Sequence, residues 1–230
     1  MKKKRRKIIV LVLLIICVLV VAFINCKVDL KSVVKDNLSE IRSELFVGES
    51  EHYRAYIASG YREEPYACDG VKNELVEFGV ITMRAKSGSV NSASYLLKVD
   101  EKEYVGQFEY DPYSSALVVD VEKYISGDNS IELTLTVNGV SEQLSLLNKS
   151  KDFALKIDDV VSLIATNYEK ELSELISLNK LQAEIFIKIA TDNDFTFNKN
   201  YYYVSICDKS GNMINFLVDV NDGNIVATKS

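Results

Sequence analysis

Hydrophobic and polar positions change their spacing three times along this chain of 230 residues. It opens with a basic cluster, residues 2–7 (KKKRRK), followed by an apolar run over residues 8–24. A helix of that length rises roughly 25 Å at ~1.5 Å per residue, close to the hydrocarbon thickness of a bilayer. The pattern predicts a transmembrane helix over residues 8–25, with the basic segment 1–7 held in the cytoplasm by its charge.

Two other uses of this pattern stay open. A basic segment followed by an apolar run also describes a cleaved secretory signal, although the run is long for one and no polar stretch precedes a cleavage site. A lipid anchor on Cys26 is the other reading, with Asn25 a poor match before a modified cysteine. All three place the rest of the chain outside the cytoplasm.

Beyond the anchor, apolar residues first recur at helical spacing. They lie at Leu30, Val34, Leu38, Ile41 and Leu45, with charged residues on the other faces. This stripe predicts a helical stalk over residues 26–48. The alternative for its last part, residues 43–47, is the first strand of the part that follows.

From residue 49 to 152 the spacing becomes two, which is typical of strands with one buried face. Turn-rich breaks separate the candidate strands 52–59, 75–84, 94–99, 104–110, 116–121, 131–137 and 140–147. Seven short strands at this spacing predict an all-β immunoglobulin-like sandwich.

The clearest signal in that region is the hairpin around Asn138-Gly139. Both turn positions of a two-residue loop need positive φ, which Asn and Gly tolerate. The loop predicts that Val137 faces Val140, that Leu133 faces Leu144 and that Ile131 faces Leu146, while Leu135 faces Glu142.

Residues 153–230 change pattern again. A helix with Asp158 or Asp159 at its start is predicted to run to about Asn179, and four strand-like segments follow at 183–191, 201–207, 213–220 and 224–228. One helix followed by antiparallel strands predicts a C-terminal α+β domain with the helix packed across the sheet.

Three features of this C-terminal part can be compared with known families: the helix entry Asp158-Asp159, the strand YYVSI at 202–206 and the ending FLVDVNDGNIV at 216–226. Together they resemble the PepSY-type domain of bacterial exported proteins, a PepSY- and cystatin-like arrangement. The resemblance implies a small envelope interaction module or a restraint on proteases. It implies no catalytic residues.

Charge narrows the class of partner. Six of the 27 Lys and Arg residues lie in the basic cluster, and all 33 Asp and Glu residues lie beyond the apolar run, so the exterior part has a net charge of 21 − 33 = −12. Such a surface disfavours nucleic acid and other polyanions, which bind clustered cations. We therefore expect no nucleic-acid partner.

Candidate chemistry is sparse. The single histidine, His52, excludes multi-histidine metal sites, and the Asp-Gly turn near the C-terminus lacks the glutamate of a calcium loop. Nucleophile-elbow, zinc-protease and nucleotide-loop motifs are missing from the sequence. We expect no catalytic residues, no metal and no cofactor. Cys68 and Cys207 either lie apart as small buried side chains or form a bridge between the two folded parts.

Aromatic residues give the only candidates for binding. The densest group contains Tyr201, Tyr203 and Phe195, and Tyr202 is expected to point to the opposite face of the strand. A second group contains Tyr53 and Tyr56. Tyrosine offers large contact area at low entropic cost, so these five residues, Tyr202 excluded, are the predicted partner-docking residues.

The sequence therefore predicts a non-catalytic binding protein of a bacterial envelope. It would be a single-pass cell-membrane protein attached through residues 8–25, with a cytoplasmic N-terminus, an extracellular bulk and an envelope protein or peptide as partner. Regulation or inhibition of a secreted or membrane protease is the alternative that the PepSY-type resemblance favours. A hydrolase with an unrecognised site is a third and weaker alternative.

Overall fold

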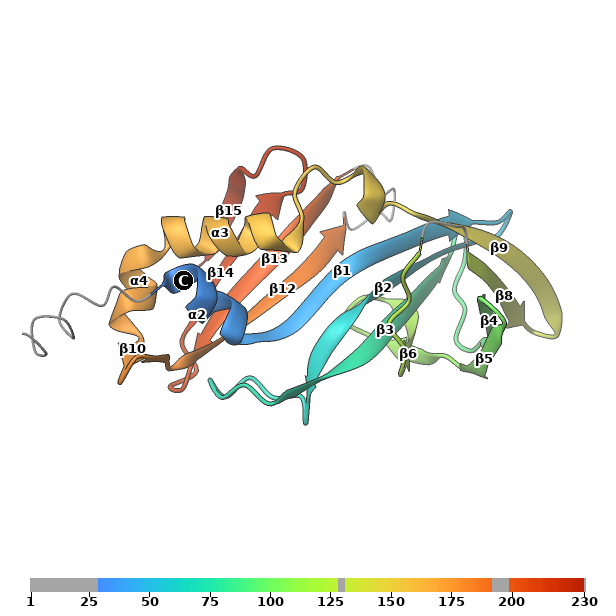
Figure 1. Cartoon of the computed structure of the whole chain (residues 1–230). Helices are drawn as coiled ribbons and strands as arrows, with labels where there is room; N and C mark the ends of the chain where they lie inside the picture. Colours follow the sequence, from blue (N-terminus) through green and yellow to red (C-terminus); the bar gives the residue numbers. More distant parts are fainter. Residues whose placement is uncertain (1–28, 128–130, 192–198, 230) are drawn as a thin grey trace, which may run out of the picture.

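The computed structural model describes residues 29–127, 131–191 and 199–229. Strands contain 56% of these residues and helices 14% (Figure 1). The helices are α2 (Leu30–Asp36), α3 (Ile157–Asn167), α4 (Glu169–Glu174) and a 3-10 turn at Ser150–Asp152. The strands are β1 (Leu38–Glu49), β2 (Tyr53–Glu64), β3 (Glu74–Ala85), β4 (Ser94–Val99), β5 (Lys102–Gln107), β6 (Glu109–Asp111), β7 (Ala116–Val121), β8 (Ile131–Val137), β9 (Val140–Asn148), β10 (Ile176–Ser177), β11 (Lys180–Leu181), β12 (Ala183–Thr191), β13 (Asn200–Asp208), β14 (Met213–Asp219) and β15 (Ile225–Lys229).

Strand β1 organises the molecule, because it belongs to two branches of one sheet. One edge of β1 pairs with β2 along most of its length. The other edge pairs in parallel with β12 at residues 38–41, and then antiparallel with β9 at residues 46–47. The branch that starts at β12 continues through β13, β14 and β15. The branch that starts at β9 continues through β8, β4 and β5. Together with β1, β2, β3, β7 and β6 they form a nearly closed sheet of 13 strands among the described residues.

Two hydrophobic clusters correspond to the two branches. One lies between the branch β12–β15 and the helices α2, α3 and α4, which cover one face of that branch (Figure 1). The other lies between β1, β2, β3 and β7 on one side and β4, β8 and β9 on the other. Phe46 belongs to the second cluster, whereas Leu45 and Val47 belong to the first, so β1 is buried on both faces near its end.

The hairpin prediction is confirmed in every pair. Val137 faces Val140, Leu133 faces Leu144, Ile131 faces Leu146, and Leu135 faces Glu142. Asn138 and Gly139 have φ of 52° and 79°, the left-handed backbone that a tight two-residue loop needs. The alternation buries Ile131, Leu133, Leu135 and Val137 and turns the residues between them outward. Packing of β8 and β9 against the other sheet layer is consistent with the coarse prediction of a β-sandwich.

The predicted fold class is nevertheless wrong. The chain does not form a sandwich followed by a separate α+β domain, because β12 pairs directly with β1 and continues the same sheet. The predicted helix from Asp158 to Asn179 breaks into α3 and α4, followed by a tight β10–β11 turn. Leu178 and Asn179 in that turn have φ of 51° and 60°, which is incompatible with a continuing right-handed helix.

The predicted stalk over residues 26–48 is also wrong. Helix α2 ends at Asp36, and the open alternative of a strand at 43–47 is the correct one, although the strand begins earlier, at Leu38. The spacing of apolar residues predicted the wrong element because a strand buried on both faces carries apolar residues without strict alternation. In this strand the apolar residues happen to recur at helical spacing.

The predicted transmembrane segment, residues 8–25, lies outside the described residues. Among the residues that the structure does describe, no helix has the length and apolar character to cross a bilayer.

Candidate functional site

A polar cleft lies where the two branches of the sheet separate. Strand β1 leaves β12 at Ile41 and joins β9 at Phe46. Between these points its pairing with β2 shifts register between Arg42 and Glu44, so that Ser43 is an extra residue. A bulge of this kind bends a strand and redirects its side chains, and here it turns β1 toward the opening between the branches.

The cleft has a volume of about 560 Å³ and is lined from both branches. The lining residues come from the bulge of β1, the connection after β7, the end of β9, the start of α3 and strand β13. They are Ser43, Glu44, Tyr124, Gly127, Asn148, Ser150, Lys151, Lys156, Ile157, Asp158 and Tyr202. Ligand sites often occupy such junctions between two cores.

A fixed carboxylate stands at the centre of the cleft. One oxygen of Glu44 accepts hydrogen bonds from Asn148 Nδ2 at 2.7 Å and from Ser150 Oγ at 2.9 Å. Its other oxygen lies 3.4 Å from the Tyr124 hydroxyl. Asn148 also donates to the carbonyl oxygen of Gly127 at 3.0 Å. Two segments distant from Glu44 in sequence, one at Tyr124 and one at Asn148 to Ser150, thus hold this acceptor group.

Groups of both charges and two neutral phenols complete the cleft. Lys156 Nζ donates to the carbonyl oxygen of Ser150 at 3.1 Å, and Asp158 pairs with Lys35 at 2.8 Å. Burial raises the pKa of Tyr124, and burial together with nearby carboxylates raises the pKa of Tyr202 to about 12. Both phenols therefore remain protonated near neutral pH. The arrangement can bind polar and charged groups.

The structure places the predicted docking residues in separate surroundings. Tyr201 and Tyr203 are half-buried on the face of β13 that the helices leave uncovered, whereas Tyr202 is buried against the helices, as the alternation predicted. Tyr203 donates to Asn215 Oδ1 at 2.6 Å. Tyr53 packs against the second hydrophobic cluster and Tyr56 against the first, so they do not form one patch.

Phe195 lies outside the described residues. The docking role of these aromatic residues remains a prediction.

Sequence reasoning missed the cleft. Glu44 lies inside an apolar stripe and appears there as a solvated charge, and its partner Asn148 is 104 positions away. The only local signal was the run Asn148-Lys149-Ser150, where the alternation of β9 stops. Nothing in the spacing connects that run to β1.

A second polar cluster lies beneath the connection between β2 and β3. Glu40 is 1% exposed and contacts Arg42 Nε at 2.6 Å, Lys188 Nζ at 2.7 Å and the Tyr66 hydroxyl at 2.7 Å. Burial would raise the pKa of Glu40, but the charges of Arg42 and Lys188 and its hydrogen bonds outweigh burial and hold the pKa below its usual value. This cluster is a satisfied buried network rather than an open site.

A different carboxyl group beneath the same connection has the opposite shift. Glu184 is fully buried and accepts a hydrogen bond from the backbone N–H of Val71 at 2.6 Å. Burial, followed by its hydrogen bond to the Asp69 side chain, raises the pKa of Glu184 to about 7. Within the described ranges, no group of three or more His, Cys, Asp or Glu side chains is placed to hold a metal ion.

Glu184 should make stability depend on pH. Its pKa rises from an ordinary 4.5 to about 7 on folding, so the folded chain keeps a proton that the unfolded chain has released. The free energy of unfolding should therefore fall as pH rises through this window. Glu184→Gln, which resembles the protonated form, should be more stable than the wild type by about 1–2 kcal/mol at about pH 8 and similar to it near pH 4.

Urea unfolding of both proteins across this pH range measures the effect. Glu101→Gln, at an exposed position, is the matched control and should follow the wild type. Parallel curves for the wild type and Glu184→Gln would show that Glu184 titrates normally.

Comparisons of the chain with protein-family models, with curated proteins and with solved structures found no match. The resemblance to PepSY-type domains therefore remains a prediction from the residues quoted above.

Proposed function

We propose that this protein is a non-catalytic binding protein of a bacterial envelope, and that the cleft between the sheet branches binds an extended segment of an envelope protein or peptide. The observation that carries the proposal is the carboxylate of Glu44, fixed by Asn148 and Ser150 in an open polar cleft. A preorganised acceptor of this kind binds without paying for reorganisation on contact.

The chemistry of the cleft favours a peptide as the ligand. Carboxylates at Glu44 and Asp158 suit cationic side chains, while the ammonium group of Lys156 suits backbone carbonyl groups. The exterior charge of −12 attracts basic segments and repels anionic polymers. We therefore propose a positively charged extended segment as the preferred partner.

The proposed place of action follows from the N-terminus. The basic cluster 2–7 and the apolar run 8–24 support attachment to the cell membrane through residues 8–25, with the bulk of the chain outside. The cleft would then face envelope proteins and secreted chains.

Restraint of an envelope protease is the second candidate. It is supported by the residue pattern at 202–206 and 216–226, which resembles PepSY-type domains. In that case the segment bound in the cleft would belong to the protease, and the purified exterior part should slow proteolysis by the captured enzyme.

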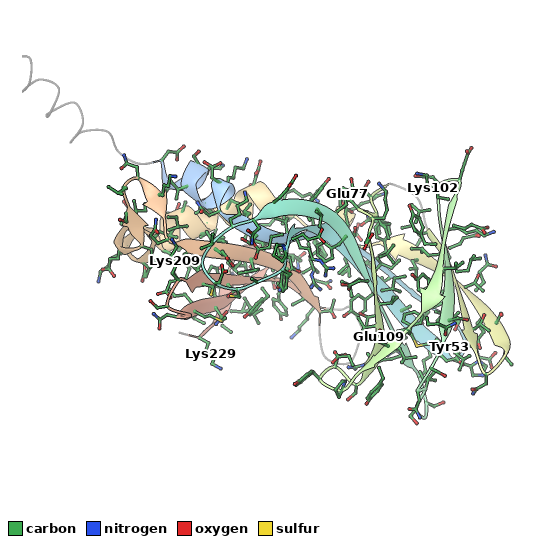
Figure 2. The ribbon with its side chains drawn as sticks, turned by 90° about the horizontal axis from the view of Figure 1, so that it is seen from below. Tyr53, Glu77, Lys102, Glu109, Lys209 and Lys229 are labelled. Atoms are coloured by element: carbon green, nitrogen blue, oxygen red, sulfur yellow. The ribbon has the colours of Figure 1, made fainter. Side chains whose placement is uncertain are left out.

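Photo-crosslinking in intact cells tests the proposal. A photoreactive amino acid replaces Lys151, an exposed residue that lines the cleft, and separately replaces Lys102 on the edge strand β5. Lys102 lies at the far end of the molecule from Lys209 and Lys229 and does not line the cleft (Figure 2). We expect a discrete adduct from position 151 and none from position 102.

Glu44→Gln in the position-151 background should reduce the adduct several-fold, because the carboxylate is lost while the shape is kept. No adduct at 151, or equal yields at both positions, would contradict binding at the cleft. As a control for outward placement, protease added to spheroplasts should degrade the domain.

A further inference from the structure

The connection between β2 and β3, residues 65–73, forms a strap across one end of strands β12 and β13. Figure 2 shows this connection passing over the branch β12–β15 on the side away from the helices. The Tyr66 hydroxyl donates to Glu40 at 2.7 Å, and the backbone N–H of Val71 donates to Glu184 at 2.6 Å. A Cβ added to Gly70 would lie only 2.5 Å from the backbone N of Lys209, so the strap rests directly on the end of β13.

The strap brings the two cysteines of the described chain together. Cys68 is exposed in the middle of the strap, and Cys207 is buried at the end of β13. The Sγ of Cys207 lies 3.7 Å from the backbone carbonyl oxygen of Cys68. This contact places the two residues next to each other, and a disulfide joins residues whose Cα atoms lie about 4.4–6.8 Å apart.

We propose that Cys68 and Cys207 are a redox-active pair that forms a disulfide and fastens the strap to the sheet. The fixed approach of the strap, held on both sides of Cys68 by Tyr66 and Val71, carries this inference. Neither contact depends on the cysteines themselves, so the pair is preorganised in the reduced protein. The proposal does not rest on the peptide-binding function proposed above.

The chemistry is a two-step exchange with a small disulfide such as oxidised glutathione. The thiolate of exposed Cys68 attacks one glutathione sulfur, forms a mixed disulfide and releases one glutathione thiolate. Cys207 then loses its proton to solvent, attacks the Cys68 sulfur and releases the second glutathione thiolate. Two protein thiols are oxidised and one glutathione disulfide is reduced to two thiols, so electrons and atoms balance.

Burial fixes the order of these steps. Cys207 is inaccessible to glutathione, and burial together with neighbouring Cys68 raises its pKa, so it reacts slowly as a nucleophile. Closure of the bond should therefore be the slow step, and its rate should increase as pH rises. The mixed disulfide on Cys68 should accumulate first.

The experiment uses the full purified chain, reduced and then incubated with oxidised glutathione at about pH 8.5, where the thiolate fraction is larger. Free thiols are alkylated and the protein is mapped by mass spectrometry without reduction. We expect a linked pair of peptides that contain Cys68 and Cys207, preceded by glutathione on Cys68 alone. Hydrogen exchange at the Val71 and Asn73 amides should slow in the oxidised protein.

Two variants keep the test specific. Cys68→Ser, at an exposed position, should fold and lose both the linked peptide and the slowed exchange. The double variant Cys17→Ser, Cys26→Ser should keep both, because those cysteines are not part of the pair. Persistent alkylation of Cys207, or a mixed disulfide on Cys68 that never closes, would overturn the proposal.

Discussion

Truncation of Leu133 to alanine should lower the free energy of unfolding by about 2–5 kcal/mol, because it leaves a cavity in a closely packed core. Leu133 is completely buried in the middle of β8. It faces Leu144 on β9 and Leu97 on β4, and both of these are also buried. The substitution removes contacts with both neighbouring strands. Because these strands are held by their own pairing, they cannot move inward to fill the cavity.

Thr134→Ala is the matched control on the other face of the same strand. Thr134 lies beside Gln143 and Leu96 and is only partly buried, so its loss should change stability by no more than about 0.5 kcal/mol. Urea unfolding of the exterior chain from Asp29 onward compares the two variants. A larger effect from Thr134→Ala than from Leu133→Ala would mean that the two faces of β8 are exchanged.

The parts of the fold that could be predicted are those decided by local chemistry. Strands β4, β7 and β12 begin and end at the predicted residues, 94–99, 116–121 and 183–191. The hairpin of β8 and β9 is correct to the residue, because a two-residue Asn-Gly loop fixes the register without help from the rest of the chain. Alternation also placed Tyr202 correctly on the opposite face of β13 from its neighbours.

The parts that failed are those decided by distant pairing. Nothing near Leu38 reveals that this residue pairs with Ile185, so the parallel contact of β1 with β12 could not be anticipated, and one sheet was predicted as two domains. Strand β1 also packs against both hydrophobic clusters, so both of its faces are buried and its alternation is lost. Where packing rather than local spacing selects the conformation, a strand and an amphipathic helix are hard to separate in sequence.

The candidate site is invisible for a related reason. Glu44 lines the cleft only because the bulge directs its side chain there and because Asn148 and Ser150 hold its carboxylate by hydrogen bonds. The pairing of Cys68 with Cys207 likewise depends on the strap crossing the end of β13. The sequence offered these residues as candidates without indicating which of them meet.

Gly60→Ala should lower the free energy of unfolding by more than about 4 kcal/mol. Gly60 on β2 faces Arg42 on β1, directly beside the bulge. A Cβ at this position would overlap the carbonyl oxygen of Ile41 and lie 2.8 Å from its carbonyl carbon and 3.0 Å from the Arg42 Cα. All three atoms are backbone, so no side-chain rotation relieves the overlap, and β1 must move away from β2.

That movement should also reach the cleft, since the bulge beside Gly60 positions Ser43 and Glu44. Gly79→Ala is the control: it adds the same methyl group to the neighbouring strand β3, where the nearest atoms, Ile125 Cδ1 and the Lys123 carbonyl oxygen, lie at 3.3 Å. We expect Gly79→Ala to fold with a loss of about 1 kcal/mol or less. We expect Gly60→Ala to unfold at much lower urea concentration, or to accumulate as insoluble protein, because a loss of this size is a large share of a domain's total stability. Equal unfolding midpoints for the two variants would show that β1 and β2 are further apart at the bulge than described, and the orientation assigned to Glu44 in the cleft would fail with it.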